Sequence, residues 1–171
     1  DREYAGPIYE AGMRGTDWWR FGRALAAVGV GKGDIVQNCF AYRFTPAGMM
    51  FESAAAAVGA VVVPAGTGQT EMQATAMANL GVTVYAGTPD YLKAILEKGE
   101  ALGLDLSSVT RACVSAGPLF PALRQDYEER GITCRQCYGT ADVGHIAYES
   151  LALDGMIVDE GVIVEIVVPG T

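Results

Sequence analysis

Five short apolar runs alternate with longer segments of helical character along most of this chain. The runs lie at residues 34–38, 60–64, 82–86, 111–115 and 132–137. A strand that is buried on both faces reads as a continuous apolar run, and a helix between two such strands makes them parallel members of one sheet. The pattern therefore predicts an α/β fold, with a mostly parallel sheet and helices on its faces.

The segments between the runs carry the start signals of helices. Thr16 or Asp17 can cap a first helix that begins near Trp18. Pro46 suits the first turn of a second helix, and Thr70 can cap a third. We expect helices at about 18–28, 46–58, 71–80, 90–102 and 121–130.

The pattern changes after Asp142. Short apolar segments at 143–149, 156–158 and 162–168 follow one another without a helical segment between them, which predicts a short antiparallel β appendage. A chain of 171 residues is about the size of one domain. We therefore expect a single partial domain, made of an irregular segment (1–15), a parallel α/β core (16–142) and a β-rich extension (143–171).

Charge and hydropathy exclude several classes of partner. The formal net charge is −8, which argues against nucleic acid and anionic membranes, since both attract basic surfaces. No apolar run approaches the roughly 20 residues of a membrane span. No basic segment followed by an apolar one opens the chain, so we expect a cytoplasmic protein.

The four cysteines are expected to be ordinary buried thiols. They are Cys39, Cys113, Cys134 and Cys137. The last two form a CxxC, but side chains three positions apart in a regular strand point to opposite faces of the sheet. His145 is the only histidine, so a four-ligand zinc site is poorly supplied and we predict no zinc. Redox or metal use of the CxxC remains the minor alternative.

Loops that follow the strands of a parallel sheet meet at one edge, where open α/β sheets bind their ligands. These loops are residues 39–48, 65–71, 86–90, 115–120 and 138–142. Most of them place glycine beside Thr, Ser or Pro, so backbone N–H groups can approach a ligand. The last loop adds Thr140 and Asp142, which suggests a nucleotide with Mg²⁺. The alternative is a polar loop that merely closes a strand.

Other signals in these loops are weaker. Phe40, Tyr42 and Phe44 could line an apolar pocket or pack beneath their own loop. Arg43 could pair with an anionic substrate or face solvent. The chain has no P-loop, no GxGxxG that opens a helix and no GxSxG elbow. The residues alone therefore do not name a reaction.

The motifs GDIVQN, YRFTPAG, VYAGTPD, SAGPLF and QCYGTAD follow one another along the chain. In this order and spacing they resemble phenylacetate–CoA ligase and its relatives among the adenylate-forming enzymes of the acyl-CoA synthetase superfamily. The resemblance implies an ATP-dependent, AMP-forming ligase for an aromatic or related carboxylic acid. ATP, CoA, the acid and Mg²⁺ are the small molecules that it implies, with Mg²⁺ and positioned donors stabilising charge on the phosphate oxygens.

The resemblance also implies roles for individual residues. Tyr138 would lie near the adenine, Thr140 would hydrogen-bond the phosphate, and Asp142 would hold Mg²⁺, which makes Thr140 and Asp142 the candidate catalytic pair. The implied nucleotide-binding residues are Ser115, Ala116, Gly117, Tyr138, Gly139 and Thr140. The implied acyl-binding residues are Tyr42, Arg43, Ala47, Gly87, Thr88 and Pro89. Two positions depart from the family pattern, since Pro118 stands where Glu is frequent and Arg43 where His is frequent.

Other parts of the family pattern have no counterpart in this sequence. These are the Lys-bearing phosphate loop, the ribose-binding Asp and the C-terminal domain with its catalytic Lys. The resemblance therefore implies a central fragment of the large N-terminal domain, inactive by itself and with apolar faces that favour self-association as a homo-oligomer. The alternative is a non-catalytic nucleotide- or acyl-binding domain of the same fold.

Overall fold

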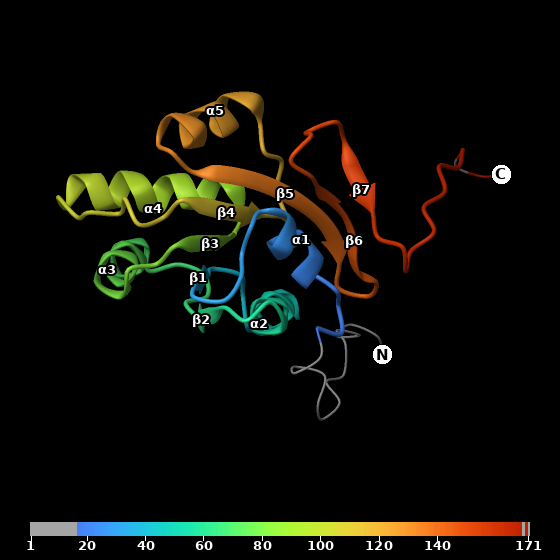
Figure 1. The fold of residues 1–171 in the computed structure, drawn as a ribbon, viewed down its shortest axis with the longest axis horizontal. Helices are drawn as coiled ribbons and strands as arrows, with labels where there is room; N and C mark the ends of the chain where they lie inside the picture. Colours follow the sequence, from blue (N-terminus) through green and yellow to red (C-terminus); the bar gives the residue numbers. More distant parts are fainter. Residues whose placement is uncertain (1–16, 169, 171) are drawn as a thin grey trace.

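The computed structural model describes residues 17–168 and residue 170, so the expected irregular segment 1–15 lies outside the described part (Figure 1). Seven strands of the described part form one sheet in the order β2-β1-β3-β4-β5-β6-β7. The strands are β1 (Ile35–Asn38), β2 (Val61–Val63), β3 (Val84–Gly87), β4 (Arg111–Val114), β5 (Thr133–Thr140), β6 (Gly144–Glu149) and β7 (Met156–Val158).

Strand pairing confirms the predicted fold class. β1 through β5 pair in parallel, whereas β6 and β7 join the same sheet in antiparallel fashion. The three central parallel strands, β1, β3 and β4, are short and mostly buried, as β3 illustrates with all of its residues inside the protein. Apolar side chains on both faces of such a strand leave no face for solvent, which is why these runs lack polar alternation.

Helices cover both faces of the sheet. They are α1 (Gly22–Ala27), α2 (Ala47–Ala57), α3 (Thr70–Leu80), α4 (Pro89–Ala101) and α5 (Pro121–Glu129). One core contains Leu25 of α1 and Phe51 of α2, and the other contains Met77 of α3 and Ile95 of α4. The CxxC spans the sheet as predicted, because Cys137 belongs to the first core and Cys134 to the second.

The first helix is shorter than predicted. It begins at Gly22, and a turn occupies the residues that were expected to form its first part. Asp17 and Arg20 in this turn have φ angles of 48° and 64°, which a right-handed helix does not admit. The side chain of Asp17 does accept a hydrogen bond from the N–H of Gly22, at 2.8 Å. The turn is fixed instead by β6, since the N–H of His145 donates to the carbonyl of Trp19 at 2.9 Å.

Two expectations at the C-terminal side were also wrong. β5 does not end at Cys137 but continues to Thr140, because β6 pairs with this stretch around a bulge between Tyr138 and Gly139. Residues 162–168 were expected to form a strand but have no regular structure. They leave the body of the protein beyond β7 (Figure 1), with Ile166 fully exposed.

No helix in the described part of the chain has the length and apolar character that crossing a membrane requires.

Candidate active site

The loops that follow β1, β3, β4 and β5 meet at one edge of the sheet, as the sequence predicted. The N–H of Cys39 donates to the carbonyl of Ala86 at 2.7 Å, which ties the first loop to β3. The N–H of Ser115 donates to the carbonyl of Gly87 at 3.1 Å, and its hydroxyl donates to the carbonyl of Cys137 at 2.8 Å. Ser115 therefore joins the ends of three neighbouring strands.

A cavity of about 440 Å³ opens beside the loop after β4 and the end of β5. Its walls combine a small-residue loop with one exposed aromatic side chain, Tyr138, which is 54% exposed. The lining residues are Ser115, Ala116, Gly117, Pro118, Gln136, Cys137, Tyr138, Gly139 and Met156. Its size lies within the usual range of small-molecule sites.

A smaller cavity of about 90 Å³ lies on the other side of the same loop. Its lining carries no charged residue, and only hydroxyl side chains interrupt the apolar surface. The lining residues are Phe21, Phe40, Thr45, Pro46, Ala47, Met50, Phe51, Ser115, Ala116, Gly139, Thr140 and Ala141. The rings of Phe40 and Phe51 stack at 4.3 Å between centroids, and Phe21 lies 4.7 Å from Phe51.

The two cavities share a wall made of Ser115, Ala116 and Gly139. Ala116 has a φ of 61°, a left-handed conformation that costs a non-glycine residue about 1–3 kcal/mol and that clusters at functional sites. Only two short pieces of backbone therefore separate a larger compartment, which contains Gln136 and Tyr138, from a smaller one that contains three phenylalanines. This arrangement suits a ligand with two chemically different halves.

Gly139 is glycine for a steric reason. A Cβ atom at this position would lie 2.5 Å from the carbonyl oxygen of Gly144 and 2.6 Å from the ring of Phe21. Any side chain would push β5 away from β6 and from the segment before α1. The glycine thus permits the close contact from which the wall between the compartments is built.

Thr140 is the last residue of β5, and Asp142 lies in the turn that follows it. Thr140 lines the smaller cavity, and its hydroxyl accepts a hydrogen bond from the N–H of Val143 at 3.2 Å. Asp142 is exposed in the turn between β5 and β6 and lines neither cavity. Among the described residues, no group of three or more His, Cys, Asp or Glu side chains is placed to hold a metal ion.

The acyl-binding candidates are only partly brought together. Ala47 lines the smaller cavity. Arg43 is exposed, and the Tyr42 hydroxyl accepts a hydrogen bond from the side-chain amide of Asn38 at 2.9 Å. Burial and the neighbouring Glu52 raise the pKa of Tyr42. Five of the six candidates line neither of the two cavities: Tyr42, Arg43, Gly87, Thr88 and Pro89.

Several lining residues were not predicted as site residues, among them Phe21 and Gln136. Phe21 reaches the smaller cavity from the turn before α1, although its spacing in the sequence is equally that of a helix core residue. Gln136 lines the larger cavity, where its side-chain amide and its backbone N–H both donate to Glu149 at 2.9 Å. Arg124 donates to the same carboxylate at 2.6 Å. A polar residue inside a buried strand was the available signal for Gln136.

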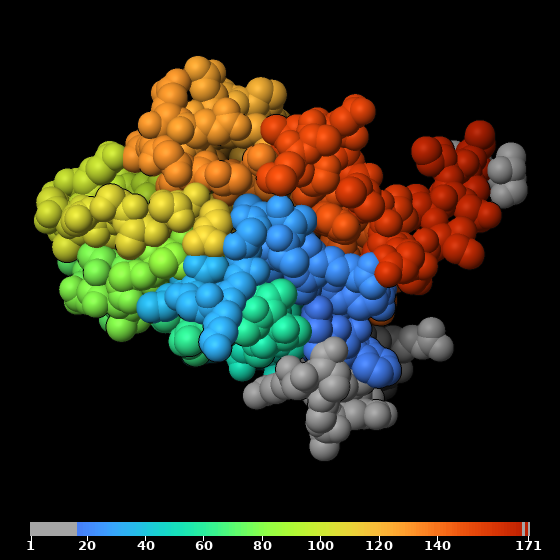
Figure 2. All heavy atoms as spheres, in the orientation of Figure 1, coloured from blue at the N-terminus to red at the C-terminus, as the bar shows by residue number. Residues whose placement is uncertain are grey.

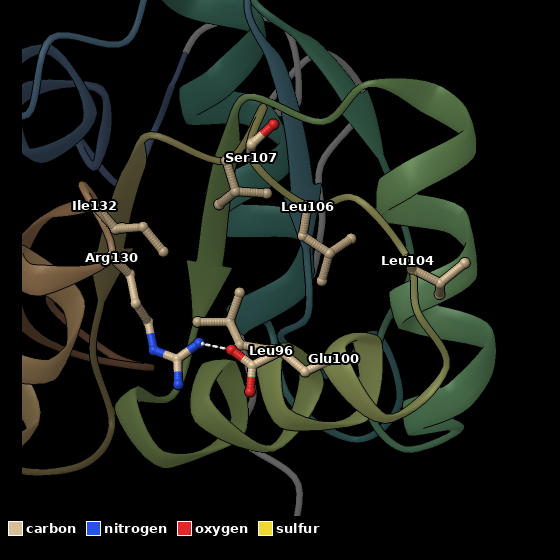
Figure 3. A pocket seen from close by; sticks show the side chains of 8 residues that line it. Leu96, Glu100, Leu104, Leu106, Ser107, Arg130 and Ile132 are labelled. Atoms are coloured by element: carbon tan, nitrogen blue, oxygen red, sulfur yellow. Dashed lines mark hydrogen bonds and ion pairs between the residues drawn. The ribbon is translucent and has the colours of Figure 1, made fainter.

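Another cavity, of about 250 Å³, lies at the opposite edge of the sheet (Figure 3). Val109 and Ile132, which line it, lie within two residues of the starts of β4 and β5, so it opens at the amino ends of the strands. Figure 3 shows aliphatic side chains around it and an ion pair between Arg130 and Glu100. This cavity belongs to a different part of the fold from the glycine-bearing loops.

Comparison with known proteins supplies the family context. Residues 39–165 match the family model described as AMP-binding enzyme. Phenylacetate-coenzyme A ligase from Aromatoleum evansii is 29% identical over 136 residues, which are 77% of this chain and 31% of that protein. The enzyme of the same name from Escherichia coli K12 is 32% identical over 125 residues, which are 71% of this chain and 29% of that protein. The chain thus spans about three tenths of the length of these curated relatives.

Solved structures with the same fold include an open conformation of 2-hydroxyisobutyryl-CoA ligase in complex with 2-HIB-AMP and CoA. Its TM-score is 0.76 at 18% identity, over 88% of this chain and 35% of that one. A Mycobacterium tuberculosis fatty acyl CoA synthetase has a TM-score of 0.64 at 17% identity, over 79% of this chain and 28% of that one. At these identities the similarity establishes the fold.

Proposed function

This chain belongs to the family of AMP-binding enzymes, and from that premise we propose that it supplies nucleotide- and acyl-binding surfaces of an ATP-dependent, AMP-forming acyl-CoA ligase. The parent protein resembles phenylacetate–CoA ligase and activates an aromatic or related carboxylic acid. The chain corresponds to a central part of the large N-terminal domain of such an enzyme. By itself it binds ligands without turning them over, because groups from elsewhere in the parent complete the reaction.

The shared wall between the two cavities is the observation that carries this proposal. An acyl-adenylate joins an acyl group to AMP through one phosphate, so it needs two adjoining compartments, one for the base and one for the acyl group. Ser115, Ala116 and Gly139 border both cavities. The phosphate would lie at this wall, beside the hydroxyl of Thr140, with the base in the larger cavity and the acyl group in the smaller one.

The larger compartment has the features of a purine site. Tyr138 offers an exposed ring on which a base can stack, a contact worth about 1–3 kcal/mol. The side-chain nitrogen of Gln136 donates to Glu149, so the amide oxygen of Gln136 is left to accept a hydrogen bond from the base. Ser115 is committed to the carbonyl of Cys137 and acts here by shaping the wall.

The smaller compartment accommodates the acyl group. Phe21, Phe40 and Phe51 contribute three aromatic rings to a lining without charge, so the apolar end of an acid enters it and the carboxylate stays outside. An ionised carboxylate that entered would lose its hydration without a partner. Binding thus directs the nucleophilic oxygen towards the wall where the phosphate lies.

Mg²⁺ fits this site as a companion of the nucleotide. Mg²⁺ in such enzymes is usually held by one or two carboxylates together with substrate phosphates and water. Asp142 is an exposed carboxylate one turn from Thr140, and no larger cluster of ligands is present in the described part. Asp142 would hold the ion, which neutralises charge on the phosphates when it is bound.

The proposed reaction proceeds in two steps. The carboxylate oxygen attacks the α-phosphorus of ATP, which forms the acyl-adenylate and expels pyrophosphate. The thiolate of CoA then attacks the acyl carbon, which forms the thioester and expels AMP. This chain positions the acid and the nucleotide for the first step, because holding two reactants in the correct orientation lowers the barrier to their reaction.

Calorimetric titration of AMP into the chain tests the proposal, with Tyr138→Ala and Tyr138→Phe as matched variants. We expect the alanine variant to weaken AMP binding about tenfold or more, since it removes the stacking surface, and the phenylalanine variant to keep it. Binding that is undetectable in the unaltered chain, or equal in all three proteins, would refute the nucleotide site.

A second candidate function is a non-catalytic binding domain of the same fold. Pro118 favours it, because a residue without a carboxylate lines the larger cavity at a position where the family often has Glu. Acid-dependent release of pyrophosphate by the parent protein separates the two candidates. Release supports the ligase, and nucleotide binding without release supports the binding domain.

A further inference from the structure

The turn that carries Asp142 is held from outside by Arg20. Within the turn, the N–H of Val143 donates to the hydroxyl of Thr140, but this hydrogen bond is exposed to solvent. The Nη2 group of Arg20 donates to the carbonyl of Val143 at 3.4 Å and to that of His145 at 3.3 Å. One guanidinium therefore binds two backbone carbonyls on the C-terminal side of the turn.

The same guanidinium is anchored on a buried carboxylate. The Nε group of Arg20 donates to Asp159 at 3.1 Å, and the side chain of Asp159 is fully buried. Asp159 also accepts from the N–H of Gly161 at 2.8 Å and faces His145 Nδ1 at 3.3 Å and Arg23 Nε at 3.5 Å. Two arginines and an imidazole surround this carboxylate, which fixes the direction of the Arg20 fork.

The backbone around Arg20 packs directly on the hairpin of β5 and β6. The carbonyl of Trp19 accepts from the N–H of His145 at 2.9 Å. A Cβ atom on Gly144 would lie 2.9 Å from that carbonyl oxygen, and one on Gly139 would lie 2.6 Å from Phe21. Figure 2 shows the corresponding contact between the blue segment that begins at residue 17 and the orange-to-red residues.

Arg20 has a φ of 64°. Such a conformation persists in a non-glycine residue only when the surrounding contacts over-determine it. Here those contacts come from β6 and from the residues just after β7, far away in the sequence. The residue that holds the turn is therefore itself held in a strained conformation.

We propose that Arg20 is a positioning residue for the nucleotide site, which it serves by holding the turn of Thr140 and Asp142 against the cavity wall. This inference rests on the proposed function. Arg20 touches no ligand in this proposal, since its guanidinium is committed to Asp159 and to two backbone carbonyls. It acts through the turn, whose residues meet the phosphate and its cation.

Two substitutions separate the side chain from its strained backbone. Arg20→Gly removes the fork and leaves a residue that adopts positive φ freely, so the backbone can keep its path. Arg20→Lys keeps the charge near Asp159 but replaces the planar fork by a single ammonium group, which cannot reproduce all three contacts. Arg130→Gln is the matched control, because Arg130 is similarly exposed (28% against 33%) and pairs with Glu100 at the opposite edge of the sheet.

Amide hydrogen exchange and AMP titration of the full chain test the inference. We expect Arg20→Gly to accelerate exchange selectively at residues 141–144 and to weaken AMP binding about tenfold, roughly the loss of one charge-assisted hydrogen bond. Arg20→Lys should lie between this variant and the unaltered chain, and Arg130→Gln should match the unaltered chain. A merely structural role would accelerate exchange in the core strands as well.

The outcomes separate the inference from the function on which it rests. Unchanged exchange at 141–144 in both Arg20 variants, or a loosened turn with intact AMP affinity, would overturn the role of Arg20. Absence of AMP binding by the unaltered chain would refute the nucleotide site itself. In that case the exchange data still decide whether Arg20 holds the turn. If Arg20→Gly fails to fold, Arg20→Lys gives the same comparison.

Discussion

Alanine at position 139 cannot fit without moving the backbone. Its Cβ atom would lie 2.5 Å from the carbonyl oxygen of Gly144 and 2.6 Å from the ring of Phe21, whereas non-bonded carbon atoms prefer about 3.5–4.0 Å. The oxygen belongs to the paired strand β6, and Phe21 is packed against Phe51. Neither neighbour can give way by a simple rotation.

The cost of Gly139→Ala follows from these distances. Overpacking of this kind usually costs about 1–3 kcal/mol, and a clash with backbone belongs at the upper end of that range. Replacing glycine also lowers the entropy of the unfolded chain, which offsets about 0.4–1 kcal/mol. A net loss of roughly 2 kcal/mol in the free energy of unfolding lowers the melting temperature of a chain of this size by about 4–8 °C.

Thermal unfolding followed by circular dichroism measures this loss. Gly117→Ala is the matched control, because Gly117 lines the same cavity and its added Cβ would meet Pro89 at an ordinary 3.4 Å. We expect the control to melt within about 2 °C of the unaltered chain, since small surface changes stay within about 0.5 kcal/mol. Equal melting temperatures for the two variants would refute the steric account of Gly139.

Two further predictions concern buried titratable groups. Burial lowers the pKa of His145, the only histidine, below its ordinary 6.5. The unfolded state then binds the proton more readily, so stability should fall as pH drops below about 6.5, and His145→Phe should flatten this slope of melting temperature against pH. Burial raises the pKa of Asp17, which changes stability with pH in the opposite direction, but Asp17 is present in both the unaltered chain and the variant. Equal slopes of melting temperature against pH in these two proteins would contradict the role of His145. Separately, burial raises the pKa of two thiols to about 12, so a thiol reagent should modify the cysteines only as the chain unfolds, and rapid reaction in the native state would contradict their burial. The thiols are Cys39 and Cys134, and all four cysteines are free and buried.

The predictable part of the fold is the part that local patterns determine. Continuous apolar runs fix buried parallel strands, and parallel strands place their following loops at one edge whatever the details of packing. The meeting of Ser115 with Gly87 and Cys137 at this edge follows from that rule. The faces of Cys134 and Cys137 follow from the two-residue period of a strand.

The part that could not be predicted depends on contacts distant in the sequence. The spacing of Trp18, Phe21 and Leu25 favours a helix, and nothing local indicates that Arg20 takes a left-handed conformation. The carbonyl of Trp19 is fixed by β6, more than a hundred residues later. Tertiary contacts therefore outweighed local helix propensity in this segment. The same contacts set the backbone path that brings Phe21 into the smaller cavity.

The aromatic residues of the first loop illustrate the same limit at the site itself. Alternation made Phe40, Tyr42 and Phe44 equivalent in the sequence, yet of these three only Phe40 lines either of the two cavities at the candidate site. The hydroxyl of Tyr42 accepts a hydrogen bond from the side-chain amide of Asn38 at 2.9 Å, so this side chain stabilises the loop. A pattern that names the loop cannot decide which of its side chains point inward.

The site itself follows from a change of partner along β5. The strand pairs in parallel with β4 up to Gln136 and in antiparallel fashion with β6 from Cys137 onward. Beyond Gln136 its edge towards β4 has no strand beside it, because β4 ends at Val114 and the chain turns away through Ser115. The carbonyl of Cys137 is taken by the Ser115 hydroxyl, but the backbone that follows borders the two cavities instead of another strand. The change of partner therefore lies within the candidate site: β6 holds the end of β5 along one edge, and the backbone along the other edge borders the two cavities.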